Sequence, residues 1–357
     1  MLRNLLVRIY REKDIQAINN SIEAKVKEKV LVTGGSGFIG SNLVEVLLDH
    51  GYNVRILDNF SSGSRDNISE FNHIPEFEIM EGDIRDLHCC LQAIKDVDSV
   101  IHLAALGSVP RSISEPINSN ENNVSGTLNM LVAARDSKIR RFVCASSSSV
   151  YGNSSQFGAQ PVQKKETDFP APVSPYAITK YALELYARQF YHLYGLPTIA
   201  LRFFNVFGKK QNPFSQYAAV IPIFIHQLLR GESPTIFGDG STSRDFTHVD
   251  NVTKACVQCL TAPREAFGQV FNVACGDSIT LSQLYDAIRT ELGSNIKPQY
   301  ASERQGDIKF SMADIQKARD ILAYNPELSF EQGIKKTVRW YVHQTQIQNT
   351  FRRNVTS

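Results

Sequence analysis

The sequence has no apolar run long enough to cross a bilayer. Its most apolar stretch, Tyr217–Ile225, contains Pro222 and is far shorter than the roughly 20 residues that a spanning helix needs. The first 28 residues carry charged side chains where a secretory signal is apolar, so we expect no signal peptide. These absences predict a protein with no membrane partner.

The sequence also lacks a dominant charge and a cysteine framework. Lys plus Arg number 38 and Asp plus Glu number 36, and this balance argues against nucleic acid as a partner. The cysteines are scattered through apolar segments, so we expect reduced thiols and a cytoplasmic protein. Cys256 and Cys259 have C-x-x-C spacing, but no second pair accompanies them, and we predict a helix core there and no metal site.

Short apolar segments alternate with helical ones from Lys29 onward. The expected helices lie near Ser41–Leu48, Leu87–Lys95 and Val124–Arg135, and a long one follows Ser174-Pro175, runs to about Tyr194 and stops at Gly195. The expected strands are Val30–Val32, Asn53–Leu57, Phe77–Met80, Ser99–Leu103, Arg141–Ala145 and Thr198–Arg202. This alternation predicts an α/β protein with a Rossmann-type, doubly wound parallel sheet.

A glycine-rich turn follows the first expected strand. Gly35-Ser36-Gly37-Phe38-Ile39-Gly40 fits G-x-G-x-x-G, and Asp58 ends the next strand, which predicts a dinucleotide site. The carboxylate of Asp58 suits ribose hydroxyls and would repel a 2′-phosphate, which favours NAD over NADP. The alternative is a glycine-rich turn without a cofactor. Asp83 either holds the adenine amino group or caps the next helix.

Two segments bear residues suited to proton transfer. Tyr176 and Lys180 stand four residues apart on one helix, so their side chains share a face. A neighbouring ammonium and an oxidised nicotinamide both favour the phenolate, which makes Tyr176 a candidate general base. Ser146–Ser149 lie at the carboxyl end of the fifth strand, where ligands bind in open α/β sheets, and the alternative there is a polar turn.

From Lys29 to Trp340 the sequence resembles the extended short-chain dehydrogenase/reductases. Within them it resembles the UDP-hexose 4-epimerases, most of all the group that acts on UDP-N-acetylhexosamines and their uronic acids. The resemblance rests on Thr33–Gly40, Leu57–Asn59, Gly82–Ile84, His102–Ala105, Ser146–Gly152, Tyr176–Lys180, Arg202–Gly208, Arg244–Phe246 and Arg304–Asp307.

This resemblance implies roles for the matching positions. The catalytic residues would be Ser147, Tyr176 and Lys180, and Arg244 and Arg304 would clamp the diphosphate. The implied contacts of bound NAD are Gly34, Gly37, Phe38, Ile39, Gly40, Asp58, Asn59, Ser61, Gly63, Asp83, Ile84, Leu103, Ala104, Ala105, Asn123, Tyr176, Lys180 and Phe203. The implied contacts of a UDP-sugar substrate are Gly107, Ser108, Ser147, Ser148, Asn205, Ala219, Val220, Thr235, Phe237, Arg244, Arg304, Asp307 and Ser311.

The family pattern also narrows the substrate. Ser148 and Ser149 stand where related dehydratases carry Asp-Glu and related decarboxylases carry Glu, which argues against elimination chemistry. Ser311 stands where a large Tyr restricts family members to plain hexoses, and a small residue there leaves volume for an N-acetyl group. The loop Ala104–Ser112 resembles that of enzymes for N-acetylhexosamines, with Gly107 in place of the Lys of galactose epimerases.

The resemblance implies a domain division and an activity. We expect an N-terminal extension (1–28), a Rossmann domain for NAD (29–206, with about 244–272 returning to it), a smaller C-terminal domain for the UDP-sugar (207–243 and 273–345) and a tail (346–357). The implied reaction is reversible inversion at carbon 4 through a 4-keto sugar, in a homodimer that pairs near Val124–Arg135 and Tyr176–Tyr194. The alternatives are another NAD-dependent nucleotide-sugar modifier and a non-catalytic NAD-binding sensor.

Three basic residues have two interpretations at this point. Arg111, Lys209 and Lys210 either meet the carboxylate of a uronic acid or are solvated charges.

Overall fold

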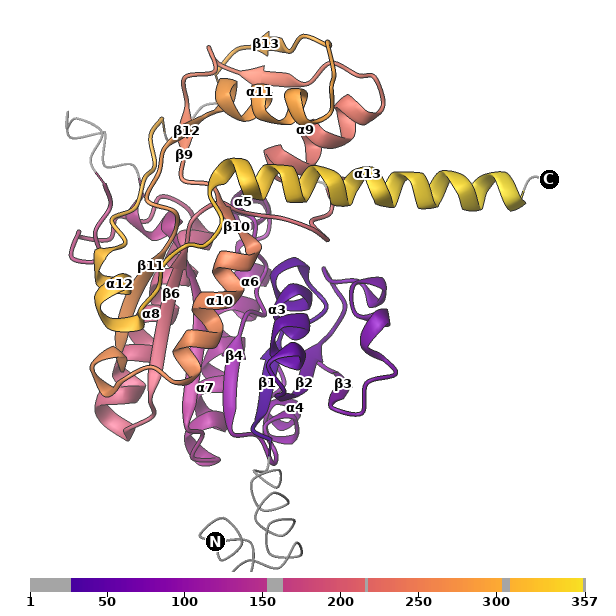
Figure 1. Ribbon diagram of the computed structural model, residues 1–357. Coiled ribbons are helices and arrows are strands. Elements are labelled where there is room, and N and C mark those ends of the chain that lie inside the picture. Colours follow the sequence, from indigo (N-terminus) through magenta and orange to yellow (C-terminus); the bar gives the residue numbers. More distant parts are fainter. Residues whose placement is uncertain (1–26, 153–162, 216–217, 304–308, 356–357) are drawn as a thin grey trace, which may run out of the picture.

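The core of the protein is a sheet of seven parallel strands (Figure 1). The structure, a computed structural model, describes residues 27–152, 163–215, 218–303 and 309–355. In spatial order the strands are β11 (Gln269–Val273), β6 (Thr198–Phe203), β5 (Arg141–Ser147), β4 (Ser99–His102), β1 (Lys29–Thr33), β2 (Asn53–Asp58) and β3 (Phe77–Glu81). The predicted doubly wound α/β fold is therefore confirmed.

The central strands are buried on both faces, which explains their nearly continuous apolar sequences. The six expected strands lie within two residues of the observed ends. The seventh, β11, is not predicted as a strand, although nearly all of it falls within the segment (about 244–272) expected to return to this domain. Strand order reverses at β1, whose neighbours are β4 and β2, and this switch point is where open α/β sheets bind ligands.

Helices cover both faces of the sheet. One apolar core lies under α3 (Phe38–Asp49), α10 (Val249–Leu260) and α12 (Gln316–Leu322). A second core lies under α4 (Leu87–Ala93), α7 (Gly126–Asp136) and α8 (Pro175–Tyr194) on the opposite face. The long helix α8 has the predicted bounds, because Ser174 Oγ accepts from the N–H of Ala177 and Gly195 ends the helix in a left-handed conformation.

The connection from β4 to α7 differs from the expectation. In place of one helix from Val124, the chain forms α5 (Val109–Ser114), α6 (Pro116–Asn120) and a π-helical turn (Glu121–Ser125) before α7 begins. The Ser108 hydroxyl caps α5 by accepting from the N–H of Arg111. A proline in the first turn of each short helix favours its start, a local signal that the sequence-based reading did not use.

A third apolar core lies beyond the carboxyl edge of the sheet. It is formed by α9 (Val220–Leu229), α11 (Leu281–Glu291) and the described part of α13 (Phe330–Val355), which extends past the rest of the fold in Figure 1. We associate this core with the predicted smaller domain. Ala318 and Leu322 of α12 come from the same predicted domain but pack on the sheet instead.

Three short strand pairs complete the described fold. The parallel pairs are β7 (Val206–Phe207) with β10 (Thr247–His248), and β8 (Thr235–Phe237) with β13 (Gln299–Ala301). The antiparallel pair is β9 (Ser243–Arg244) with β12 (Ile279–Thr280). Single 3-10 turns occur at Arg65–Asn67, Ser69–Phe71, Ser148–Tyr151 and Arg264–Ala266.

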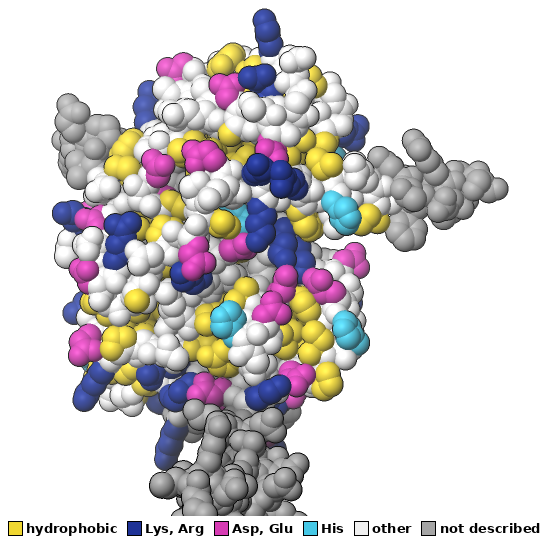
Figure 2. Space-filling model, in the orientation of Figure 1, with side chains coloured by type: hydrophobic (Ala, Val, Ile, Leu, Met, Phe, Trp, Pro, Cys, Tyr) yellow, Lys and Arg dark blue, Asp and Glu magenta, His cyan; other side chains and the backbone are white. Residues whose placement is uncertain are grey.

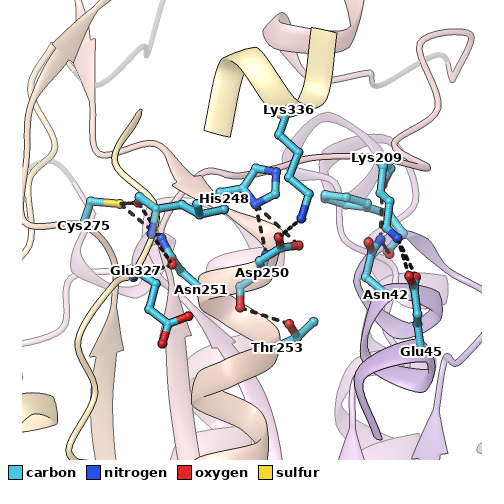
Figure 3. A network of polar contacts seen from close by, with 12 residues as sticks. Asn42, Glu45, Lys209, His248, Asp250, Asn251, Thr253, Cys275, Glu327 and Lys336 are labelled. Atoms are coloured by element: carbon cyan, nitrogen blue, oxygen red, sulfur yellow. Dashed lines mark hydrogen bonds and ion pairs between the residues drawn. The ribbon is translucent and has the colours of Figure 1, made fainter. Parts of the chain in front are cut away.

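A polar network joins the outer helix to the sheet domain (Figure 3). Lys336 of α13 pairs with Asp250 at the start of α10, and Asn251 donates to Leu328 O at 2.9 Å. Beside it, Lys209 Nζ lies 2.8 Å from Glu45 Oε1 of α3, so Lys209 contacts a carboxylate of the protein itself. Lys210 likewise pairs with Glu70 at 2.6 Å, and neither lysine lines the cavities described below.

The distribution of charged side chains on the surface agrees with the nearly equal numbers of basic and acidic residues in the sequence. Basic and acidic side chains are interspersed over the face seen in Figure 2. No helix within the described residues is long and apolar enough to cross a membrane.

Candidate active site

The turn between β1 and α3 brings backbone close to backbone. Gly34 has φ +72°, and a Cβ on Gly40 would lie 2.1 Å from Gly34 O, so neither position accommodates a side chain. Among the described residues, no side chain caps the first turn of α3, whose N-cap is Gly37. The free N–H groups and the dipole of this helix end suit an anion such as a pyrophosphate.

This turn forms one wall of a cavity of about 570 Å³ at the carboxyl edge of the sheet. Twelve of the predicted cofactor residues line it: Gly34, Gly37, Phe38, Ile39, Gly40, Asp58, Asn59, Ser61, Ile84, Leu103, Ala104 and Ala105. Asp58 accepts from the N–H groups of Ser36 (2.9 Å) and Phe60 (2.8 Å), which fixes its carboxylate at the end of β2. Its remaining lone pairs suit ribose hydroxyls, and the cradle fits a dinucleotide.

Six predicted cofactor residues do not line this cavity: Tyr176, Lys180 and Phe203 line the neighbouring cavity described below, and the other three lie elsewhere. Gly63 packs on the turn, since a Cβ there would lie 1.9 Å from Ser36 Oγ. Asp83 is held by Arg85 and by Asn59 Nδ2 (2.9 Å), and these bonds lower its pKa to about 2. Asn123 is buried, and its side chain bonds the backbone of Leu106 and the hydroxyl of Thr179, while its neighbour Asn122 lines the cavity instead.

A second cavity of about 470 Å³ adjoins the first and shares Phe38, Ile39 and Gly107 with it. It brings together predicted residues that are far apart in the sequence. Besides the predicted residues that it shares with the first cavity, it is lined by Ser147, Ser148, Tyr176, Lys180, Phe203, Asn205, Arg244 and Ser311. The continuity of the two cavities lets a dinucleotide in the first reach the side chains of α8 in the second.

The side chains of Tyr176 and Lys180 lie on one face of α8, as the spacing predicts. Lys180 Nζ lies 5.8 Å from the centre of the Tyr176 ring and donates to Ala145 O at 2.8 Å. Burial lowers the pKa of Lys180 to about 8. The Ser147 Oγ atom accepts from the N–H of Ser149 at 3.2 Å, which orients this hydroxyl at the end of β5.

The pKa of Tyr176 differs from the expectation. Burial raises it above its ordinary value, and a hydrogen bond with Ser147 opposes that rise. In the protein alone desolvation therefore outweighs that hydrogen bond, and the lowering expected from the neighbouring ammonium does not contribute to the pKa of Tyr176. A bound oxidised nicotinamide would add the positive charge that favours the phenolate.

A third cavity of about 360 Å³ continues from the second past Arg244. The predicted substrate residues Ala219, Val220, Thr235 and Phe237 line it. Further aromatic side chains line it at Phe207, Phe224 and Phe246. An apolar cavity lined by aromatic rings suits a nucleobase. Ser108 lines none of the three cavities because it caps α5, whereas Arg304 and Asp307 lie outside the described residues.

Asp245 organises the wall that carries Arg244 and Ser311. Its buried carboxylate accepts from the N–H groups of Cys275 (2.9 Å), Gly276 (3.0 Å) and Ala313 (3.2 Å), and burial raises its pKa to about 6. Sequence reasoning placed it in a motif but assigned it no role, because its partners lie far away in the chain.

Lys164, Tyr151 and Gln211 also line the second cavity, although the sequence analysis did not select them. Arg111 lines the first cavity. Cys256 and Cys259 are buried in α10 with raised thiol pKa values, about 12 for Cys256, so the helix-core interpretation fits them.

His102 predicts a pH dependence of stability. It is buried, with Nδ1 2.7 Å from Thr33 Oγ1 and Nε2 3.0 Å from Thr127 Oγ1, and burial lowers its pKa to about 3. In the unfolded chain a His titrates near 6.5, so below that pH the unfolded state binds a proton that the folded state does not. The free energy of unfolding is therefore expected to fall as the pH drops from 6.5 towards 3.

Urea unfolding of the wild type and of His102→Gln between pH 7 and pH 4 checks this expectation. The variant is expected to lose less stability over that interval, whatever its stability at pH 7. An equal loss in both proteins would show that His102 does not contribute.

Comparison with known proteins places these features in context. The sequence model of the NAD-dependent epimerase/dehydratase family matches residues 30–274. A UDP-glucose 4-epimerase from Mycolicibacterium smegmatis is 36% identical over 321 residues, which cover 89% of this chain and 100% of that protein.

Two solved structures of related enzymes are also similar to this chain. A UDP-N-acetylglucosamine 4-epimerase from Methanobrevibacter ruminantium M1, in complex with UDP-N-acetylmuramic acid, is 42% identical with a TM-score of 0.83, covering 89% of this chain and 99% of that one. A mutant UDP-glucuronic acid 4-epimerase from Bacillus cereus, in complex with UDP-4-deoxy-4-fluoro-glucuronic acid and NAD, is 29% identical with a TM-score of 0.80, covering 88% and 99%.

Proposed function

The chain belongs to the NAD-dependent epimerase/dehydratase family, and we propose that it inverts carbon 4 of a UDP-N-acetylhexosamine or its uronic acid. NAD is the cofactor of the family, and it is present in the similar Bacillus cereus structure. The observation that carries the proposal is the second cavity, in which Ser147, Tyr176 and Lys180 share one space with Ser311.

In this proposal Tyr176 removes the proton of the 4-hydroxyl while Ser147 donates a hydrogen bond to the same oxygen. NAD⁺ held by the turn from Gly34 to Gly40 and by Asp58 would supply a reversible hydride acceptor for carbon 4, so that no external oxidant or reductant would be needed. Lys180, held on Ala145 O, binds the nicotinamide ribose. Tyr176 gives the proton back after the sugar has presented its other face.

The 4-keto sugar must turn while its nucleotide stays fixed. Arg244 lies between the second and third cavities, where it suits a diphosphate whose base occupies the third. By the family resemblance we propose that Arg304 helps to clamp the diphosphate and that Asp307 binds the uridine ribose. Asn205 would contact the diphosphate or the sugar. A firm hold on UDP and a loose hold on the sugar together permit inversion.

The choice of an N-acetylhexosamine rests on volume. Ser311 lines the second cavity, which we call the sugar cavity, with a side chain that leaves room for an acetamido group. The similar Methanobrevibacter enzyme supports this choice by its name, whereas the Mycolicibacterium and Bacillus enzymes act on sugars without that group by theirs. A dehydratase or decarboxylase is the second candidate, but Ser148 and Ser149 line the cavity where those reactions use a carboxylate.

We also propose a homodimer that pairs through α7 and α8. The outer face of α8 exposes Ile178, Leu185 and Leu193, which is apolar area that a second copy would cover. The six unpaired cysteines suit the cytoplasm, the location we propose.

Proton NMR of the purified protein with UDP-GlcNAc, and no added cofactor, tests the proposed function. We expect the signals of UDP-GalNAc to appear, because NAD stays bound and is regenerated. Absence of conversion with UDP-GlcNAc, its uronic acid and UDP-glucose would contradict the proposal and favour the sensor or the other sugar modifiers.

Enlarging Ser311 tests the basis of selectivity. Ser311→Tyr is expected to lower kcat/KM for UDP-GlcNAc by about 100-fold or more while UDP-glucose loses much less, because the ring fills the space of the acetamido group. Ser311→Ala, the matched control, keeps the cavity open and is expected to retain turnover of UDP-GlcNAc. A similar loss on both sugars with Ser311→Tyr would contradict the volume argument.

A further inference from the structure

Three segments of the chain line the first cavity and are bonded to one another away from it. The first is the turn from Gly34 to Gly40, which continues into α3, and the second is the loop that follows β2 (59–71). The third, which we call the strap (Gly208–Asn212), follows β7 and contributes Gln211 and Asn212 to the lining. Bonds join each pair of these segments, so the three form a frame around the space predicted for NAD.

Lys209 joins the strap to α3 (Figure 3). Its Nζ lies 2.8 Å from Glu45 Oε1, and its carbonyl accepts from Asn42 Nδ2 at 3.2 Å. The same Nδ2 donates to Phe38 O at 2.8 Å, at the start of the helix whose free N–H groups suit the pyrophosphate. The side chain of Lys209 is 24% exposed and that of Glu45 is 34% exposed, so dissolved salt screens this ion pair.

Lys210 joins the strap to the loop that follows β2. Its Nζ donates to Asn67 O at 2.8 Å and pairs with Glu70 at 2.6 Å, and its side chain is only 10% exposed. Lys210 has φ +66°, a left-handed conformation that is unfavourable for a lysine, so these bonds hold a strained backbone in place. Asn67 Nδ2 and the N–H of Ser64 donate to Ser36 O at 2.9 Å and 3.1 Å, which joins the loop to the turn.

The side chains that attach the strap lie outside the cavities. Neither the two lysines nor their partners line any of the three cavities. A substitution at either lysine therefore leaves the cavity lining unchanged but alters how readily the frame opens. On its other side the strap meets the outer core, where the hydroxyl of Tyr341 in α13 donates to Gln211 O.

We propose that NAD enters and leaves when the strap separates from α3 and from the loop, so that Lys209 and Lys210 are positioning residues that set the rate of NAD exchange. The inference goes beyond the proposed function, because it concerns how the cofactor is retained and not which sugar is converted. Binding and release pass through the same open state, so weakening the two lysine contacts raises both rate constants.

The test measures NAD exchange in the full-length wild type, Lys209→Met, Lys210→Met and the double variant. Displacement of radiolabelled NAD by excess unlabelled NAD gives the dissociation rate constant, and calorimetry on protein freed of NAD gives Kd. We expect the dissociation rate constant to rise about 10-fold in Lys210→Met and about 2- to 5-fold in Lys209→Met, because the ammonium of Lys210 is the more deeply buried. The double variant is expected to exceed both, while Kd changes by less than about 3-fold in each variant because association is faster as well.

Lys254→Met is the matched control, since it removes a lysine that is 30% exposed and pairs with Glu327 at 2.5 Å. It is expected to exchange NAD at the wild-type rate. Exchanging the charges in Lys209→Glu/Glu45→Lys is expected to restore the slow release that Lys209→Glu loses. Raising the salt concentration is expected to speed release from the wild type more than from Lys209→Met, because salt screens the pair with Glu45.

Unchanged dissociation rate constants in both lysine variants would overturn the inference. So would faster release with Kd raised by the same factor, because that result assigns the lysines to the shape of the bound site and not to its opening. These measurements need no sugar, so their outcome is independent of whether the protein inverts carbon 4.

Discussion

Tyr176→Phe is expected to lower kcat by about 100- to 10,000-fold, the range that a positioned acid or base contributes. The variant loses the hydroxyl that hydrogen-bonds with Ser147 and that lies on the same helix face as Lys180. The phenyl ring still fills its place, so KM for the UDP-sugar and the bound NAD are expected to change little. Initial rates by NMR and the absorbance of bound cofactor measure these quantities.

Tyr186→Phe is the matched control, because Tyr186 lies on the same helix but is exposed. It is expected to keep the wild-type rate. Full activity of Tyr176→Phe would contradict the assignment of the base. A rise in KM with unchanged kcat would instead assign Tyr176 to substrate binding.

The second large effect concerns stability. Glu184 and Arg202 form a buried ion pair behind the catalytic residues, with Arg202 Nε 2.8 Å from Glu184 Oε1 and Nη2 2.7 Å from Oε2. Ser146 also donates to Glu184, and the guanidinium lies 4.5 Å from the centre of the Tyr151 ring. Glu184→Ala leaves the arginine charge buried, so we expect the free energy of unfolding to fall by about 3–5 kcal/mol.

Denaturant unfolding of Glu184→Ala, Glu184→Leu/Arg202→Met and Glu232→Ala measures this loss. The double variant removes both charges and is expected to unfold closer to the wild type than Glu184→Ala does. Glu232 pairs with Arg230 on the surface at 2.7 Å, and removing it is expected to cost about 1 kcal/mol or less. Similar losses in Glu184→Ala and Glu232→Ala would contradict the role of burial.

Local signals account for what the sequence predicts well. The helix α8 was predicted at its observed bounds because Ser174, Pro175 and Gly195 act within one turn of its ends. The turn from Gly34 to Gly40 was recognisable for the same reason, since its close contacts are within the turn itself. The short helices α5 and α6 were not predicted, because each is shorter than the periodic pattern that identifies a helix.

Tertiary contacts account for what the sequence does not predict. Lys164 lies outside every motif and comes to the sugar cavity through its bridge to Ala313. The pair of Glu184 with Arg202 joins a helix to a strand, and neither residue has a pattern that indicates the other. The raised pKa of Tyr176 arises from burial, which depends on the whole fold.

The central claim is that a hydrogen leaves carbon 4 and returns to it within one active site. The most direct test is to convert UDP-GlcNAc deuterated at carbon 4 in ordinary water and to examine the product by NMR and mass spectrometry. The account predicts UDP-GalNAc that keeps its deuterium. The transferred hydrogen does not exchange with solvent while the 4-keto sugar rotates beside Ser147 and Tyr176. Product that has lost the label to water would contradict the account.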